Sequence, residues 1–131
     1  IFYFLKINFS NTIISKYINR FFNCYNLKYV NMNATNDVTS MQSTFEYCYH
    51  FTGSPVCGNK VTNMSRTYLA CSNMIGNPVC GPNVTNMSNA YSVCYNLTGS
   101  PVCGNNVTDM SFMFAGCKNL EQKNYPTIIH K

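Results

Sequence analysis

The sequence predicts a repeat solenoid of about five coils, in which each coil of about 23 residues covers the apolar face of the next. Three observations predict this fold class. Residues 53–71, 76–94 and 99–117 carry nearly the same sequence, apolar side chains recur at the same offsets outside these blocks, and 46% of the chain is apolar. A single block has too few apolar side chains for a core, so we expect the coils to fold only as a stack.

The cysteine that ends each of these three blocks, together with its equivalent in the two earlier coils, places the coils in register, and we call it the register cysteine. These cysteines are Cys24, Cys48, Cys71, Cys94 and Cys117. At fixed offsets before each cysteine the side chain stays apolar in coil after coil, as shared core positions require. The predicted core columns are Val61, Val84 and Val107; Met64, Met87 and Met110; Tyr68, Tyr91 and Phe114; and Cys48, Cys71, Cys94 and Cys117.

Each coil is predicted to contain a short helix and a short strand or extended piece. Methionine, an aromatic residue and the cysteine follow one another at i, i+4 and i+7, which is one face of a helix. Thr62 and Asn63 stand just before such a segment, where their side chains can cap free amides. Gly53 and Pro55 indicate a turn and then a brief extended piece, in which the proline interrupts any sheet ladder.

We expect one solenoid domain over 1–131. Residues 1–24 form a divergent first coil or N-terminal cover, 25–120 form the regular repeats, and 121–131 form a C-terminal tail. No apolar run approaches the roughly 18–20 residues that span a bilayer. The net charge of +5 is modest and few basic residues fall in the repeats, so we expect no basic stripe for nucleic acid.

The segments Val-Thr-Asn/Asp-Met-Ser at 61–65, 84–88 and 107–111, each followed by an aromatic residue and a cysteine, carry a family resemblance. On these residues the chain resembles the BspA-like leucine-rich repeats of bacterial and some protist surface proteins. The resemblance is strong over 38–120 and implies a leucine-rich-repeat-like solenoid at the cell surface or in secreted form, with adhesion as its usual role. Ser54, Asn77 and Ser100 depart from the family's pattern, because they stand where it has its middle leucine.

The eight cysteines fall in two columns. The five register cysteines are interpreted as buried thiols that act as small hydrophobic side chains, as the family's pattern suggests. The second column, Cys57, Cys80 and Cys103, follows an inward valine, so strand alternation predicts a column of exposed thiols. A disulfide framework is the alternative, although stacked side chains run parallel rather than towards each other.

Glycosylation sequons recur with the repeat, for example at Asn83, Asn96 and Asn106. They allow two interpretations: glycan sites in a secreted protein, or hydrogen-bonding ladders of Asn, Thr and Ser at turns. Stacked coils leave little room for a sugar on each coil, which favours the ladders.

Catalytic, metal and cofactor sites are not expected. The acidic residues Asp37, Glu46, Asp109 and Glu121 lie in unrelated columns, and His50 takes the place of a turn asparagine. No carboxylate pair, Ser-His-Asp set, phosphate-binding glycine loop or C-x-x-C pair can be assembled from these residues. We therefore predict a protein that is not an enzyme and has no cofactor.

The favoured function is a surface or secreted module that binds a protein or glycan on another surface. Its candidate recognition face consists of helix positions that vary between coils: Arg66, Thr67, Leu69, Asn89, Ala90, Ser92, Phe112 and Met113. The alternative is a structural protein, such as a filament, spacer or virion-fibre subunit, that assembles end to end. Apolar residues at both ends, Ile1–Phe4 and Tyr125–Ile129, suggest uncapped coils that favour such self-association.

Overall fold

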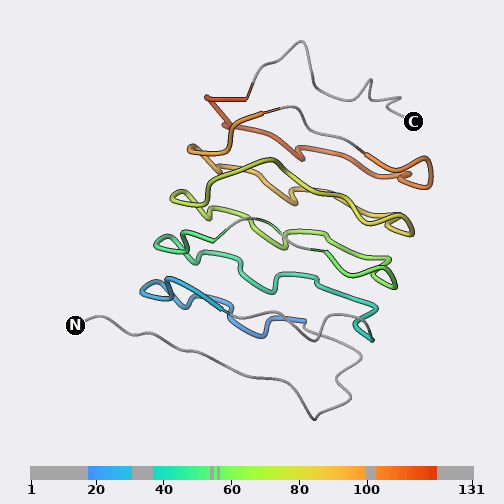
Figure 1. The fold of residues 1–131 in the computed structure, drawn as a ribbon, viewed down its shortest axis with the longest axis horizontal. Helices are drawn as coiled ribbons and strands as arrows, with labels where there is room; N and C mark the ends of the chain where they lie inside the picture. Colours follow the sequence, from blue (N-terminus) through green and yellow to red (C-terminus); the bar gives the residue numbers. More distant parts are fainter. Residues whose placement is uncertain (1–17, 31–36, 54, 56, 100–102, 121–131) are drawn as a thin grey trace.

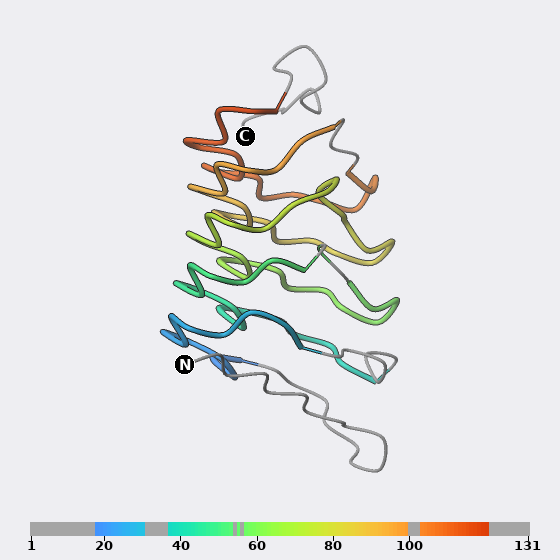
Figure 2. The same ribbon diagram turned by 60° about the vertical axis from the view of Figure 1, so that its left-hand side comes forward.

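The structure is a computed structural model that describes residues 18–30, 37–53, 55, 57–99 and 103–120. The chain winds through a stack of flattened coils, and the colours of Figure 1 follow the sequence from the first described coil to the last. Figure 2 shows the same order from a second direction, with the tight turns at one side of each coil aligned along the stack. Equivalent residues of neighbouring coils therefore lie one above another.

The expected strand and helix are absent, because the residues that the structure describes contain neither element. Between coils, β-structure is limited to isolated parallel bridges. These bridges pair Ser40 with Asn63, Asn63 with Asn86, and Asn86 with Asp109. The predicted leucine-rich-repeat-like coil, built from a strand or extended piece and a short helix, is therefore wrong.

Turn segments of six residues occupy the place of the expected helix. They span 18–23, 42–47, 65–70, 88–93 and 111–116. The N–H of Thr67 donates within its coil to the carbonyl of Met64 at 3.1 Å, whereas the next N–H, of Tyr68, donates to Ala90 in the following coil at 2.9 Å. An α-helix directs every amide along its own axis. Here alternate amides instead join neighbouring coils.

The spacing of the coils accounts for the absence of helices. Ring centroids in neighbouring coils lie 5.3 Å apart for Phe45 and Tyr68, and 5.4 Å apart for Tyr68 and Tyr91. Packed helices need about 8–10 Å between their axes, so a helix in every coil cannot fit this stack. The turn segments are also rich in Ser, Thr and Asn, whose side chains compete for backbone hydrogen bonds and disfavour helix.

Two positions in each turn segment have a positive φ. Five residues before the register cysteine they are Asn19, Ser43, Arg66, Asn89 and Phe112, and one residue before it they are Asn23, Tyr47, Ala70, Val93 and Gly116. A left-handed residue interrupts a right-handed helix. These positions therefore abolish the helical arrangement of side chains that the apolar spacing predicts.

Stacked aromatic rings form the centre of the core. The rings belong to Phe21, Phe45, Tyr68, Tyr91 and Phe114, whose neighbouring centroids are 5.3–5.8 Å apart with interplanar angles of 4–16°. Each such contact contributes about 0.5–1.5 kcal/mol beyond the burial of apolar area. The stack therefore stabilises each coil through its neighbours.

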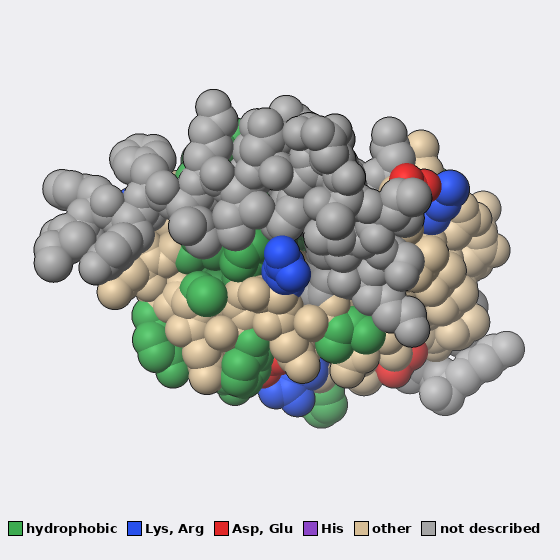
Figure 3. All heavy atoms as spheres, turned by 90° about the horizontal axis from the view of Figure 1, so that it is seen from below, with side chains coloured by type: hydrophobic (Ala, Val, Ile, Leu, Met, Phe, Trp, Pro, Cys, Tyr) green, Lys and Arg blue, Asp and Glu red, His purple; other side chains and the backbone are tan. Residues whose placement is uncertain are grey.

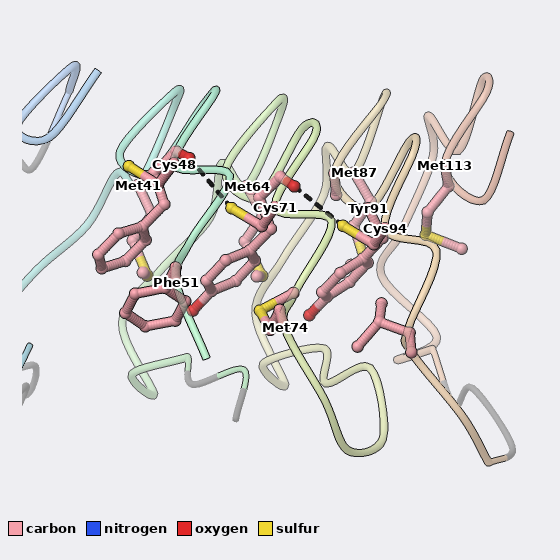
Figure 4. Packing of buried hydrophobic residues seen from close by; sticks show 14 of the residues in the cluster. Met41, Cys48, Phe51, Met64, Cys71, Met74, Met87, Tyr91, Cys94 and Met113 are labelled. Atoms are coloured by element: carbon pink, nitrogen blue, oxygen red, sulfur yellow. Dashed lines mark hydrogen bonds between the residues drawn. The ribbon is translucent and has the colours of Figure 1, made fainter. Parts of the chain in front are cut away.

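The remaining core columns surround this stack, as the close view in Figure 4 shows for the methionines and cysteines. Buried members are Val61, Val84, Met64, Met87, Cys48, Cys71, Cys94 and Cys117. Val107 and Met110, in the last described coil, are half-buried and pack against the same cluster. The valine column thus faces the interior along the stack.

The apolar ends proposed for end-to-end assembly, Ile1–Phe4 and Tyr125–Ile129, lie outside the described residues. The same is true of most of the predicted N-terminal cover and of the whole C-terminal tail. Across the described part of the chain, no helix has the length and apolar character needed to cross a membrane.

Candidate binding face

The predicted recognition face is only partly exposed. Thr67, Ala90, Ser92 and Met113 are buried, with 0–6% of each residue accessible. They cannot present their side chains to a partner, so the prediction of an exposed face does not hold for these four. The left-handed residue that precedes Thr67, Ala90 and Met113 replaces the helical geometry that would have turned them outward.

The other predicted residues reach the surface. Arg66 and Phe112 are exposed, whereas Leu69 and Asn89 are half-buried. Among the described residues, Phe112 is the most open of the large apolar side chains, with 72% of its surface accessible. The accessible part of the predicted face is thus limited to the exposed Arg66 and Phe112 and the half-buried Leu69 and Asn89.

A cluster of aromatic side chains lies beside Arg66, in the first two described coils. The rings of Tyr25 and Tyr49 stack at 5.4 Å with an interplanar angle of 7°. Tyr47 links this stack to Phe22, at 6.1 Å from Tyr49 and 5.9 Å from Phe22. Phe22, Tyr25 and Tyr49 each keep 40–49% of their surface accessible. We call the surface formed by Phe22, Tyr25, Tyr47, Tyr49 and Arg66 the turn face.

An ion pair anchors Arg66 to this face. Its Nε lies 3.1 Å from both carboxylate oxygens of Glu46, and Nη2 bonds to the same carboxylate. The Glu46 side chain is only 2% accessible, whereas that of Arg66 is 48% accessible. Hydrogen bonds to Glu46 and then to Tyr47 raise the pKa of Arg66 above its ordinary value. A buried carboxylate therefore fixes a solvent-facing guanidinium beside the aromatic cluster.

Sequence reasoning missed the aromatic members of the turn face. Tyr25, Tyr49 and Tyr95 occupy the position directly after the register cysteine, and Lys118 follows in the last coil. The Lys118 ammonium lies over the Tyr95 ring, 5.1 Å from its centroid. Tyrosine recurs at this position, which is not one of the core columns. That recurrence is the sequence signal that could have indicated exposed aromatic residues.

The second cysteine column is less exposed than predicted. Cys57, Cys80 and Cys103 are half-buried and pack against the core cluster. The Sγ of Cys57 lies where a side chain of Gly81, in the next coil, would stand, since a Cβ there would be 2.7 Å away. The Cys57 sulfur thus fills space left by a glycine rather than pointing into solvent. No disulfide joins any of the eight cysteines.

The sequon residues form hydrogen bonds along the stack. Asn83 Nδ2 donates to the carbonyl of Asn59 at 2.7 Å, and Asn106 Nδ2 donates to that of Pro82 at 2.9 Å. The hydroxyls of Thr85 and Thr108 donate to the preceding threonine's carbonyl, Thr62 and Thr85 respectively, at 3.1 and 3.2 Å. These contacts are the polar ladders expected from the sequence.

Groups that could hold a metal ion, with three or more His, Cys, Asp or Glu side chains together, do not occur among the described residues. The ring of His50 is exposed, and its Nδ1 lies 2.6 Å from the carbonyl oxygen of Tyr25. This contact ties the histidine to the neighbouring coil.

Comparison of the chain with protein-family models, with curated proteins and with solved structures found no match.

Proposed function

We propose that this chain is a non-catalytic binding module that recognises a protein on another surface through the turn face. The observation that supports the proposal most directly is the packing of exposed aromatic rings on one another, beside an arginine that a buried carboxylate of the neighbouring coil holds in place. Tyrosine, phenylalanine and arginine are the residue types enriched at the centres of protein interfaces. Backbone bonds between the coils hold these side chains in place before a partner arrives, which lowers the entropy lost on binding.

The geometry of the rings favours a protein over a glycan as the partner. Sugars stack on open aromatic faces, but Tyr25 and Tyr49 each have one face covered by the other ring. Their edges and hydroxyl groups remain for contact, and these suit backbone and side-chain groups of a polypeptide.

Charge contributes little to this face. Arg66 is already paired with Glu46, so its charge is largely compensated. Seen from the first-coil end, Figure 3 shows hydrophobic side chains at the surface and isolated charged side chains rather than a continuous basic area. The proposed partner is therefore a protein with an apolar and hydrogen-bonding patch, and nucleic acid is not proposed as a partner.

A location at the cell surface or in secreted form is part of the proposal, on the basis of the resemblance to BspA-like repeats. A binding assay on intact cells of the source organism tests whether the chain recognises a surface protein. The fluorescently labelled chain should bind saturably, and protease treatment of the cells should abolish binding while periodate oxidation of their glycans should not.

Variants connect that binding to the turn face. The double variant Tyr25→Ala/Tyr49→Ala should lose at least about tenfold in affinity, because hot-spot side chains contribute about 2 kcal/mol or more each. The control Lys60→Ala/Asn106→Ala changes exposed residues outside the turn face and should bind as the unchanged chain does. Equal binding by both variants, with their folding intact, contradicts the proposal.

Assembly end to end is the alternative function, and light scattering separates it from the first. The alternative requires particles that grow with concentration. A monomer at high concentration contradicts the alternative. Particles that grow with concentration to the same extent in the unchanged chain and in Tyr25→Ala/Tyr49→Ala contradict the turn-face proposal.

A further inference from the structure

One glycosylation sequon, Asn96-Leu97-Thr98, takes no part in the polar ladders. Asn96 and Thr98 are both exposed, whereas Leu97 between them is buried in the core and anchors the segment. Backbone bonds from Leu97 to Cys94 at 3.3 Å and from Thr98 to Gly76 at 3.2 Å hold the chain here. Within the described part of the chain, the side chains of Asn96 and Thr98 make no hydrogen bond. Their amide nitrogen and hydroxyl are therefore free to react.

The sequons at Asn83 and Asn106 differ, because the fold uses their reacting groups. The Nδ2 atom that would carry a sugar donates instead to a carbonyl of the preceding coil, at 2.7 Å from Asn83 and 2.9 Å from Asn106. The sequon hydroxyls of Thr85 and Thr108 donate between coils as well. Asn83 and Asn106 also stand one coil apart in the same column, and coils stacked at about 4.8 Å leave no room for two branched sugars side by side.

The sequons at Asn63 and Asn86 are built into the fold in another way. Both asparagines are half-buried, and their backbones form a parallel bridge with each other. Their Oδ1 atoms accept the backbone N–H of Ser65 and of Ser88, each at 2.9 Å. These side chains therefore cap the turn segments and are poorly placed to carry a bulky group.

The column of Asn96 contains no neighbouring sequon. Asn73 and Asn119 occupy its position in the coils on either side, and both are exposed. The residue two positions later is Ile75 after Asn73 and Glu121 after Asn119, so neither coil has the hydroxyl that a sequon needs. A sugar on Asn96 would thus have no other sugar beside it, and the crowding that disfavours glycans on every coil does not apply here.

We propose that Asn96 is an N-glycosylation site. The proposal rests on the secreted or cell-surface location proposed above. Its substrate class is a lipid-linked oligosaccharide with a pyrophosphate leaving group, and an oligosaccharyltransferase that reads N-x-S/T would catalyse the transfer. A glycan is bulky and hydrophilic, so it suits an exposed turn whose side chains have no structural contacts.

The transfer forms one bond and breaks two. The Nδ2 atom of Asn96 attacks the anomeric carbon of the first sugar, the bond from that carbon to the pyrophosphate oxygen breaks, and the lipid pyrophosphate leaves with the electron pair. Nδ2 gives up one proton to a base of the transferase. Because the transferase acts on the emerging chain, the fold then selects among the products: a sugar on Asn96 stays in solvent, whereas one on Asn83 stands where two coils must meet.

Expression with a cleavable secretion signal in a eukaryotic cell line tests the acceptor site. The secreted chain is treated with peptide N-glycosidase in heavy-oxygen water, which converts each glycosylated asparagine to labelled aspartate, and is mapped by peptide mass spectrometry. Most secreted molecules should be labelled at Asn96, and few at Asn83 or Asn106. An unlabelled Asn96, or greater labelling at Asn83 or Asn106, would overturn the proposal. Asn8 and Asn33 lie outside the described residues and do not enter this comparison.

Matched variants connect the glycan to the Asn96 sequon. Asn96→Gln and Thr98→Ala should each lower the mass of the secreted chain by one glycan without loss of secretion, because both side chains lack structural contacts. The controls Asn83→Gln and Thr85→Ala should keep the glycan. A glycan that persists in Asn96→Gln, or that disappears in Asn83→Gln, would contradict the assignment.

The test is independent of the turn face, because the added signal supplies the secretory route. Failure of the chain to bind cells would contradict the proposed function and leave the labelling of Asn96 unchanged. If Asn96 is labelled in the cell line but carries no glycan in the chain isolated from its source organism, the proposed location is wrong and the natural modification is rejected with it.

Discussion

The thiol of Cys94 donates a hydrogen bond to the carbonyl oxygen of Tyr68, 26 residues earlier in the chain, at 3.0 Å. Figure 4 shows this bond and its equivalent from Cys71 to Phe45, which is 3.1 Å long. The same contact recurs from Cys48 to Phe21 and from Cys117 to Tyr91. The register cysteine thus does more than fill space, because its thiol also joins each coil to the aromatic residue of the preceding coil.

Replacing Cys94 by alanine should lower the free energy of unfolding by about 1–2 kcal/mol, since both the hydrogen bond and the packing of a buried sulfur are lost. The loss stays moderate because the Tyr68 carbonyl keeps the N–H of Cys71 as a donor at 3.0 Å. Urea unfolding under reducing conditions measures the change. Cys24→Ala, at the exposed end of the column, is the control and should change stability by less than about 0.5 kcal/mol.

The buried hydroxyl of Tyr91 should be more important than its ring alone suggests. It donates to the carbonyl of Val79 at 2.6 Å and accepts from the N–H of the same residue at 3.0 Å. Tyr91→Phe leaves both backbone groups without this partner, so the free energy of unfolding should fall by about 1–3 kcal/mol. Tyr95→Phe removes a hydroxyl from an exposed ring and should have almost no effect in the same urea assay. Equal effects of the two changes would contradict this role.

The core could be predicted from the sequence because burial imposes the same chemistry on every coil. Val61, Val84 and Tyr68 recur as apolar or aromatic letters at fixed offsets, and a position that must exclude water tolerates little else. The local backbone could not be predicted in the same way. Apolar residues at i, i+4 and i+7 suit a helix, but they suit the observed pair of left-handed turns equally well.

The signal for left-handed backbone was present only in some coils. Asn19, Asn89 and Gly116 tolerate positive φ, but Arg66 and Val93 occupy the equivalent positions without any such preference. The stack imposes the conformation on them through bonds between coils, such as that from the N–H of Arg66 to Ser88 at 2.9 Å. Those bonds join residues far apart in sequence, so no local pattern reveals them.

The turn face could not be predicted from local sequence either. Tyr25 and Tyr49 lie 24 residues apart, and their stacking depends on the register of the coils rather than on local sequence. Burial of Glu46 is likewise invisible in its own coil, because its partner Arg66 comes from the next one. Contacts between coils thus decide which variable residues reach the surface.

Phe112 combines a positive φ of 53° with a side chain that is 72% exposed, so its backbone is strained and its ring gains little from burial. Phe112→Asn should raise the free energy of unfolding by about 0.5–1 kcal/mol, because asparagine tolerates the left-handed region and is found in this column at Asn19 and Asn89. Urea unfolding measures the gain.

The reciprocal change provides the matched control. Asn89→Phe should lower stability by a similar amount, since it places a poor left-handed residue in the same column one coil away. A destabilising Phe112→Asn would mean that the phenylalanine ring makes a contact more important than the relief of backbone strain.

Stability should fall at alkaline pH because the folded chain holds its buried thiols protonated. Burial raises the pKa of Cys48 to about 12 and that of Cys117 to about 11, and it raises those of Cys71 and Cys94 well above the ordinary value of 9.0. Unfolding exposes these thiols, which then lose their protons near the ordinary pKa. From about pH 9 upward the folded state therefore binds more protons than the unfolded state, and the free energy of unfolding decreases as pH rises.

Each such thiol contributes up to about 1.4 kcal/mol per pH unit in this window, so several together should produce a steep loss between pH 9 and the folded pKa values. Burial raises the pKa of Tyr91 as well, which adds a loss of the same sign. Urea unfolding at successive pH values under reducing conditions measures the slope, and Cys71→Ala should reduce it by one proton's contribution. If the free energy of unfolding stays constant or rises between these pH values, the register cysteines are exposed to water in the folded chain. The stacked core described above would then be untenable.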